Sequence, residues 1–156
     1  MPKANPKPRS RSKRSRVNPL DELVQELALA VRLERSSLLF VVAATEALRE
    51  RAAGELAAKL KARDLAVQTF SAAQVPEGDI PMAIRNETKR AKKIFFAQDL
   101  ERGGESALRA LNIRREYLTE LRARVVLFLT PNEEAALARE AADFWSFRHR
   151  TVYLDE

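Results

Sequence analysis

The stretch that decides the fold is residues 37–70, SLLFVVAATEALRERAAGELAAKLKARDLAVQTF. It begins with a continuous apolar run, passes through a segment in which apolar residues recur every fourth position from Leu48 to Leu60, and ends in a second apolar run. A continuous apolar run is typical of a strand buried on both faces, and the recurrence is typical of a helix with one buried face. The stretch therefore predicts a strand, a helix and a second strand, the repeating unit of a parallel sheet.

Three further apolar runs follow at nearly even spacing. They are KIFFAQ from Lys93, RVVLFLT from Arg124 and TVYL from Thr151, and with the runs from Ser37 and Leu65 they start 28, 28, 31 and 27 residues apart. A crossover between parallel strands needs about a dozen residues or more and is usually helical, so each gap has room for a helix. We predict an α/β fold, a three-layer sandwich with a five-stranded, mainly parallel sheet.

The composition limits the compartments in which the protein is expected and the kinds of site that it can form. The chain of 156 residues has no cysteine, which excludes disulfides, thiolate metal sites and cysteine nucleophiles, and makes a reducing cytoplasm the expected location. No apolar run reaches the roughly 18 residues of a membrane span, and the basic N-terminus lacks the apolar stretch of a secretory signal. We expect a cytoplasmic protein that makes no membrane contact.

All of the net positive charge lies in the first 16 residues. This segment carries +7 and no acidic residue, whereas the whole chain carries +6, which leaves residues 17–156 at −1. Its seven basic residues are Lys3, Lys7, Arg9, Arg11, Lys13, Arg14 and Arg16. With three prolines and no periodicity, residues 1–16 are predicted to be a disordered tail ahead of a single domain over residues 17–156. The tail is either an arm that binds nucleic acid by neutralising phosphates, or a solvated leader.

An amphipathic helix is predicted after the tail. Asn18 suits the N-cap, Pro19 suits the first helical position, and apolar residues from Leu20 to Val31 share one face of a helix that reaches about Arg35. This face either packs on the sheet of the same domain or binds a partner.

The connection after the first strand reads AATEA, residues 43–47. A nucleotide-binding strand–helix unit would have a glycine-rich loop there, with a lysine that reaches the phosphates. AATEA contains neither, and Glu46 puts negative charge where a phosphate would lie. We therefore interpret Thr45 and Glu46 as helix-start residues, and we expect Arg49, like the charged residues that follow it on this helix, to face water.

Acidic residues follow the third apolar run in KIFFAQDLERGG. Many NTPases hold magnesium with an acid just after a strand, so Asp99 or Glu101 is the candidate metal ligand. The alternative is loop solvation, because a lone carboxylate without further oxygen ligands binds magnesium poorly. Gly103 and Gly104 are expected to turn the chain into a helix from about Glu105.

The clearest local signal for the start of a helix follows the fourth apolar run. Thr130 suits an N-cap, Pro131 the first helical position, and Glu133 completes a capping box for a helix that reaches about Ala142.

An aromatic group, Phe144, Trp145 and Phe147, precedes the last run. It either fills the seam between a helix and the sheet or forms an exposed patch that binds a partner. His149, the only histidine, has no visible partner in the sequence and is expected at the surface.

At the level of a family, the order of these segments resembles the ATPase core of STAND-class P-loop proteins, the signal-transduction ATPases. More narrowly, it is similar to a degenerate branch of bacterial domains that precede tetratricopeptide-type repeats. The segments LNIRREYLTEL (residues 111–121) and REAADFWSFR (residues 139–148) carry most of the similarity, which extends over about residues 18–155. The resemblance implies the sheet order 5-1-4-3-2, with Asp99 at the Walker B position and Thr130 near the end of the sensor strand.

The chain departs from this family in lacking a Walker A motif and a second acid directly beside Asp99. The resemblance thus implies an inactive relative, without a cofactor, that works through protein contacts in bacterial signalling or defence. The sequence leaves three hypotheses: a non-catalytic P-loop-ATPase-like module that binds a protein partner or itself, a nucleic-acid-associated protein that binds through its tail, and a metal-dependent enzyme that uses Asp99 and Glu101 with Glu46.

Overall fold

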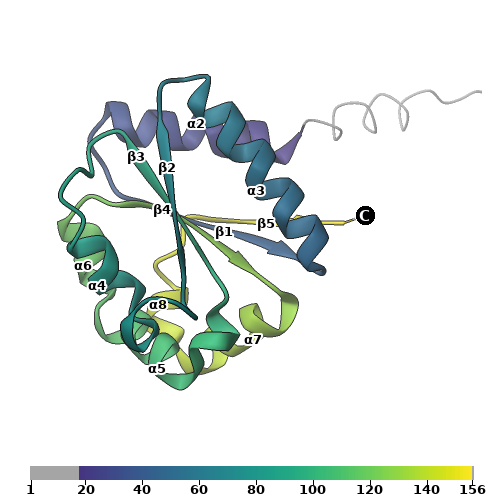
Figure 1. The fold of residues 1–156 in the computed structure, drawn as a ribbon, viewed down its shortest axis with the longest axis vertical. Helices are drawn as coiled ribbons and strands as arrows, with labels where there is room; N and C mark the ends of the chain where they lie inside the picture. Colours follow the sequence, from purple (N-terminus) through teal and green to yellow (C-terminus); the bar gives the residue numbers. More distant parts are fainter. Residues whose placement is uncertain (1–17, 156) are drawn as a thin grey trace, which may run out of the picture.

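The computed structural model describes residues 18–155 and has one sheet with helices on both faces (Figure 1). The elements in chain order are α2 (Pro19–Arg32), β1 (Ser37–Ala43), α3 (Glu46–Lys61), β2 (Ala66–Ser71), the 3-10 turn η1 (Pro76–Gly78), α4 (Ile80–Arg85), β3 (Lys93–Gln98), α5 (Leu100–Ile113), α6 (Arg115–Glu120), β4 (Arg124–Leu129), α7 (Pro131–Glu140), α8 (Ala142–Trp145) and β5 (Arg150–Leu154). The five apolar runs are the five strands, so the predicted α/β fold with a five-stranded sheet is confirmed.

The strand order is β2-β3-β4-β1-β5, and every neighbouring pair is parallel. The sheet predicted as mainly parallel is therefore parallel throughout. All residues of β1 and of β4 are buried, which explains why these two runs are apolar without interruption. β2 and β5 form the two edges.

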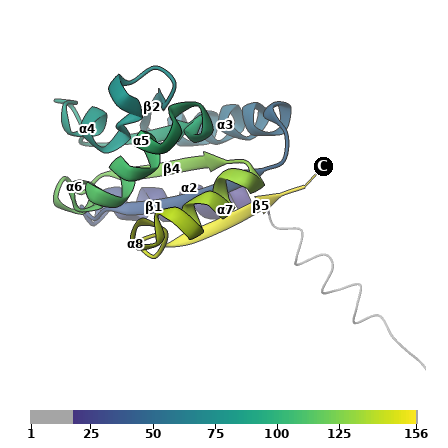
Figure 2. The same ribbon diagram turned by 90° about the horizontal axis from the view of Figure 1, so that it is seen from below.

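Two helical layers cover the sheet. Helices α2 and α3 pack on one face, and α4 to α8 pack on the other. In Figure 2 the second layer spreads across the sheet, with α4 and α5 toward the β2 side and α7 and α8 toward the β5 side. The chain leaves β1 along the first face and leaves the adjacent β4 along the second, which opens a crevice between their carboxyl ends, the usual ligand position in open parallel sheets.

The helices begin where their capping residues predict. The Asn18 side chain accepts a hydrogen bond from the Leu20 amide, and the Thr45 side chain caps α3. Thr130 and Glu133 form both halves of a capping box at the start of α7. These caps satisfy backbone amides that have no partner within the helix.

The helix after β3 is divided by a kink. α5 starts at Leu100, but Gly104 lies inside it with a φ of 71° and a ψ of −160°, so a first turn of helix ends there and a second helix continues from Glu105. Gly103 serves close packing, because a Cβ there would lie 2.7 Å from the Ala107 Cβ and 2.8 Å from the Ala72 Cβ. The predicted turn at the glycines, with a helix from about Glu105, is therefore confirmed at Gly104, whereas the turn of helix before it was not predicted.

Candidate functional site

A small cavity of about 200 Å³ lies at the carboxyl edge of the sheet, at the crevice between β1 and β4. Three connections line it, those that follow β1, β3 and β4. The residues with polar side chains that line it are Thr45, Glu46, Arg49, Asp99, Glu101, Arg102, Thr130 and Glu133. The structure thus brings the candidate metal ligand Asp99 together with the helix-start residues of α3 and α7.

Asp99 is held by two side chains from other elements. Its Oδ2 accepts a hydrogen bond of 2.6 Å from the Ser71 hydroxyl at the end of β2, and its Oδ1 lies 3.1 Å from Nη1 of Arg49 on α3. The side chains of Asp99 and Arg49 are only 13% and 16% exposed. The Asp99 backbone has a φ of 65°, a left-handed conformation that is uncommon outside glycine. Both carboxylate oxygens are therefore occupied by the protein's own donors.

Arg49 is the site residue that the sequence missed. It was expected to face water, but its guanidinium lies between Asp99 and Glu46, whose carboxylate is 3.3 Å from Nη2. Its Nε is buried and has no hydrogen-bond partner within the part of the chain that the structure describes. The helical pattern places Arg49 next to the buried Leu48, at the border of the apolar face, and only the tertiary position of Asp99 turns the side chain inward.

Glu133 joins two connections at this edge. It is 8% exposed, and its Oε1 accepts from the Thr130 amide at 2.9 Å while its Oε2 accepts from the Glu101 amide at 2.8 Å. One carboxylate thus satisfies an amide in the first turn of α5 and the N-cap amide of α7. Both contacts place negative charge at the positive end of a helix dipole, which stabilises it.

Several polar groups at this edge are already engaged within the protein. The Thr45 hydroxyl accepts a hydrogen bond of 3.1 Å from the Leu48 amide, so one backbone donor at the start of α3 is already used. Glu101 is exposed and contributes its amide, rather than its carboxylate, to the contact with Glu133. Across residues 18–155, no group of three or more histidine, aspartate or glutamate side chains is arranged to hold a metal ion.

A further acid–hydroxyl pair lies toward the β5 side of the carboxyl edge. The Tyr153 hydroxyl donates a hydrogen bond of 2.5 Å to Oε2 of Glu134. This hydrogen bond, with some burial, raises the pKa of Tyr153 above its ordinary value. Tyr153 is 61% exposed, so the pair belongs to the surface rather than to the cavity.

The aromatic group does not form one exposed patch. Phe144 is 1% exposed and packs with Phe40 in the core, which contradicts its candidacy as a partner-binding residue. Trp145 is half-buried, its ring centroid lies 5.6 Å from that of Phe40, and the Arg148 guanidinium lies over the indole at 3.7 Å from its centroid. Phe147 is 37% exposed and is the member of the group that a partner could reach most fully. The seam interpretation therefore describes Phe144 and Trp145.

His149 has a hydrogen-bond partner, Leu38, that could not be predicted from the sequence. Its Nδ1 accepts a hydrogen bond of 2.9 Å from the Leu38 amide, and its own amide donates to the Leu38 carbonyl. The residue is exposed, as expected, but its ring also anchors the start of β5 to β1. The candidate nucleic-acid residues, Lys3, Lys7, Arg9, Arg11, Lys13, Arg14 and Arg16, lie outside the described residues.

No protein-family model matches the chain, and no curated protein matches it either. None of the helices in residues 18–155 combines the length and the apolar composition needed to cross a membrane.

Proposed function

We propose that this chain is a non-catalytic module of P-loop-ATPase-like architecture that acts by binding a protein partner or itself. The observation that carries the proposal is the ion pair between Arg49 and Asp99. In an active NTPase the acid after this strand holds magnesium and the loop after the first strand holds phosphates. Here the Arg49 guanidinium, on α3, is paired with the Asp99 carboxylate. The AATEA connection contains no glycine-rich loop.

Two further observations support the proposal. Read from β5, the strand order 5-1-4-3-2 agrees with the order that the resemblance to STAND-class proteins implies. The carboxyl-edge cavity, at about 200 Å³, is also smaller than the roughly 300 Å³ at which ligand pockets of drug-sized molecules begin. By the same resemblance, bacterial signalling or defence is the setting in which such a module would work.

Calorimetry with ATP and with GTP tests the non-catalytic half of the proposal. With magnesium present and nucleotide at millimolar concentration, the 156-residue chain is expected to give no saturable heat. A dissociation constant below about 100 μM, which corresponds to about −5.5 kcal/mol, would contradict the proposal and restore the enzyme hypothesis. The Arg49→Ala variant is the matched comparison, because it frees Asp99 while leaving the AATEA connection unchanged.

A second candidate function is nucleic-acid binding through residues 1–16. The observation that favours it is the charge distribution, since these residues carry +7 and the remaining chain −1. Deleting residues 1–16 should abolish any binding to DNA or RNA and leave the melting temperature nearly unchanged. If the shortened chain still binds with steep salt dependence, the basic site lies in the folded part instead.

A further inference from the structure

The edge strand β2 leaves part of its backbone open. β2 pairs only with β3, and the Ala66 and Ala72 amides donate to that side. Because the direction of backbone groups alternates along a strand, those of Val67 and Thr69 point away from the sheet. The strand, AVQTFS, contains no charged residue and no proline, the usual devices that prevent an edge from pairing with another chain.

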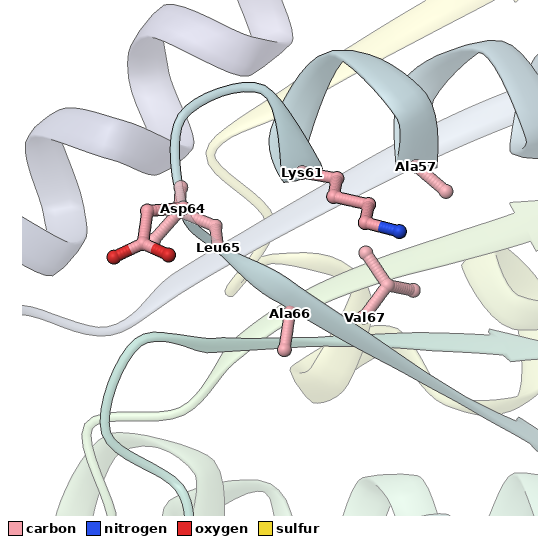
Figure 3. A pocket seen from close by; sticks show the side chains of 6 residues that line it. All are labelled: Ala57, Lys61, Asp64, Leu65, Ala66 and Val67. Carbon is pink, nitrogen blue, oxygen red and sulfur yellow. The ribbon is translucent and has the colours of Figure 1, made fainter.

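A groove runs beside this edge. It has a volume of about 460 Å³ and lies between the carboxyl-terminal half of α3 and the start of β2 (Figure 3). Figure 3 shows Val67 pointing from the strand toward Ala57 and Lys61 of the helix. Its lining is mainly apolar, and its two charged residues are Lys61 and Asp64.

The exposed stripe of α3 beside the groove is complementary to itself. Glu50, Gly54, Ala57 and Lys61 are spaced by four, three and four residues and therefore share one helix face. Two small residues lie between an acid and a base, and neither Glu50 nor Lys61 has an ion-pair partner within residues 18–155. A twofold axis midway along the stripe brings Glu50 opposite Lys61 of a second copy and Gly54 opposite Ala57.

One axis can serve the helix and the strand together. Lys61 lies roughly 8 Å from the midpoint of the stripe at about 1.5 Å per residue. Val67, which lines the same groove as Lys61, lies roughly 7 Å from Thr69 at about 3.3 Å per residue. The midpoint of the stripe and Thr69 are thus level along the edge. An axis perpendicular to the sheet through Thr69 pairs the two strands antiparallel and sets the two α3 helices side by side on the same face.

We propose that two copies of this chain join through β2 and α3 to form one continuous ten-stranded sheet with α3 of each copy across the seam. The inference rests on the proposed function, and it names the partner as a second copy of the chain. With the axis at Thr69, the two Thr69 residues exchange both of their outward backbone groups, and the Ser71 amide of each copy donates to the Val67 carbonyl of the other. The Ser71 carbonyl stays bonded within the turn that follows β2. The helices add two ion pairs between Glu50 and Lys61. The small residues at the seam let the helices approach closely.

Sedimentation of the full 156-residue chain over a range of concentrations tests the proposal. The unmodified chain is expected to sediment as a dimer. Thr69→Lys sets two ammonium groups face to face across the axis and should give a monomer with unchanged circular dichroism. Tyr153→Lys is the matched control, because it adds a lysine at an exposed position of the opposite edge strand, and it should leave the dimer intact.

A charge exchange separates complementarity from loss of fold. Glu50→Lys and Lys61→Glu, each alone, place like charges across the seam and should weaken the dimer about tenfold or more. The double variant restores opposite charges across the axis and should recover the original dimer affinity. Recovery in the double variant supports the proposed register, and its absence overturns it.

Cysteine crosslinking provides an independent reading, because the chain has no cysteine of its own. Thr69→Cys should form a disulfide between copies under mild oxidation, whereas Tyr153→Cys should not. A chain that stays monomeric at about 100 μM, or a dimer that is indifferent to Thr69→Lys, overturns the homodimer. Nucleotide binding in the calorimetric test would instead overturn the proposed function, so the two failures are distinguishable.

Discussion

Residues with positive φ occur at both ends of the strands, which we call the amino edge and the carboxyl edge of the sheet, but they have different surroundings at the two. At the amino edge, α2, α3 and α6 all end in one repeated turn, with a charged residue at positive φ: Glu34 at 54°, Asp64 at 64° and Arg122 at 53°. In each turn the next amide donates to the carbonyl five residues back, as in a Schellman motif. At the carboxyl edge, Asp99 also has positive φ, but no repeated turn surrounds it.

The side chains show what this difference means. The side chains of Glu34, Asp64 and Arg122 are between 64% and 95% exposed, so their backbones are set by the helix end alone. Asp99 is 13% exposed, and two other connections hold its carboxylate. The same left-handed geometry is therefore a local capping device at the amino edge and a tertiary contact at the carboxyl edge. Substitutions should separate the two.

The largest effect is expected at Asp99. Asp99→Ala leaves the Arg49 guanidinium largely buried without its carboxylate and should lower the free energy of unfolding by about 2 to 4 kcal/mol. Urea denaturation followed by circular dichroism measures this change. The control is Glu46→Ala, which removes the exposed partner of the same arginine and should cost about 0.5 kcal/mol or less. Equal losses in the two variants would show that the Asp99 contact contributes no more than a surface ion pair.

The next effect is expected at Glu133. Glu133→Ala removes the acceptor of two amides, those of Thr130 and Glu101, and should cost about 2 kcal/mol. Hydrogen exchange should show both amides losing protection together. Asn132→Ala, at the neighbouring exposed position, should change the unfolding free energy by about 0.5 kcal/mol or less. Loss of protection at only one amide would contradict the shared role of the carboxylate.

The smallest effect, and the one of opposite sign, is expected at the amino edge. Asp64→Gly relieves the left-handed backbone and should stabilise the protein by about 0.5 to 1 kcal/mol, because its carboxylate is exposed and its ion pair with Lys92 is long at 4.0 Å. Asp99→Gly should destabilise despite the same backbone relief. Thermal unfolding compares the two variants, and a shared sign would remove the distinction between the edges.

Much of the fold follows from local sequence signals. The strands were predictable because each is a separate apolar run, and the starts of α2, α3 and α7 were predictable because Asn18, Thr45 and Thr130 cap them through contacts with nearby residues. The short helix α4 was missed, since its six residues are too few to show a periodicity. The single turn of helix from Leu100 to Gly103 was also missed because it is short, whereas the turn at Gly104 was predicted.

The candidate site was harder to predict than the fold. Asp99 and Glu133 were singled out from their positions after strands and caps, but the sequence did not show that Arg49 would lie against Asp99. Fifty residues separate the pair, and nothing in a helical pattern reports a partner at that distance. The same holds for His149 and Leu38, which are 111 residues apart.

The interior position of β1, between β4 and β5, has a consequence for how the chain folds. β1 is made early, yet its two neighbours in the sheet, β4 and β5, lie far later in the chain, and its pairing with β5 needs residues up to Leu154. Contacts between distant segments slow folding, because a long loop must close before they form. During synthesis, the six apolar residues of β1 therefore have no neighbouring strand until β4 has left the ribosome, and they lack β5 until almost the whole described chain has emerged. The step that limits folding should be the insertion of β1 between β4 and β5, and the chain should depend on chaperones during that interval.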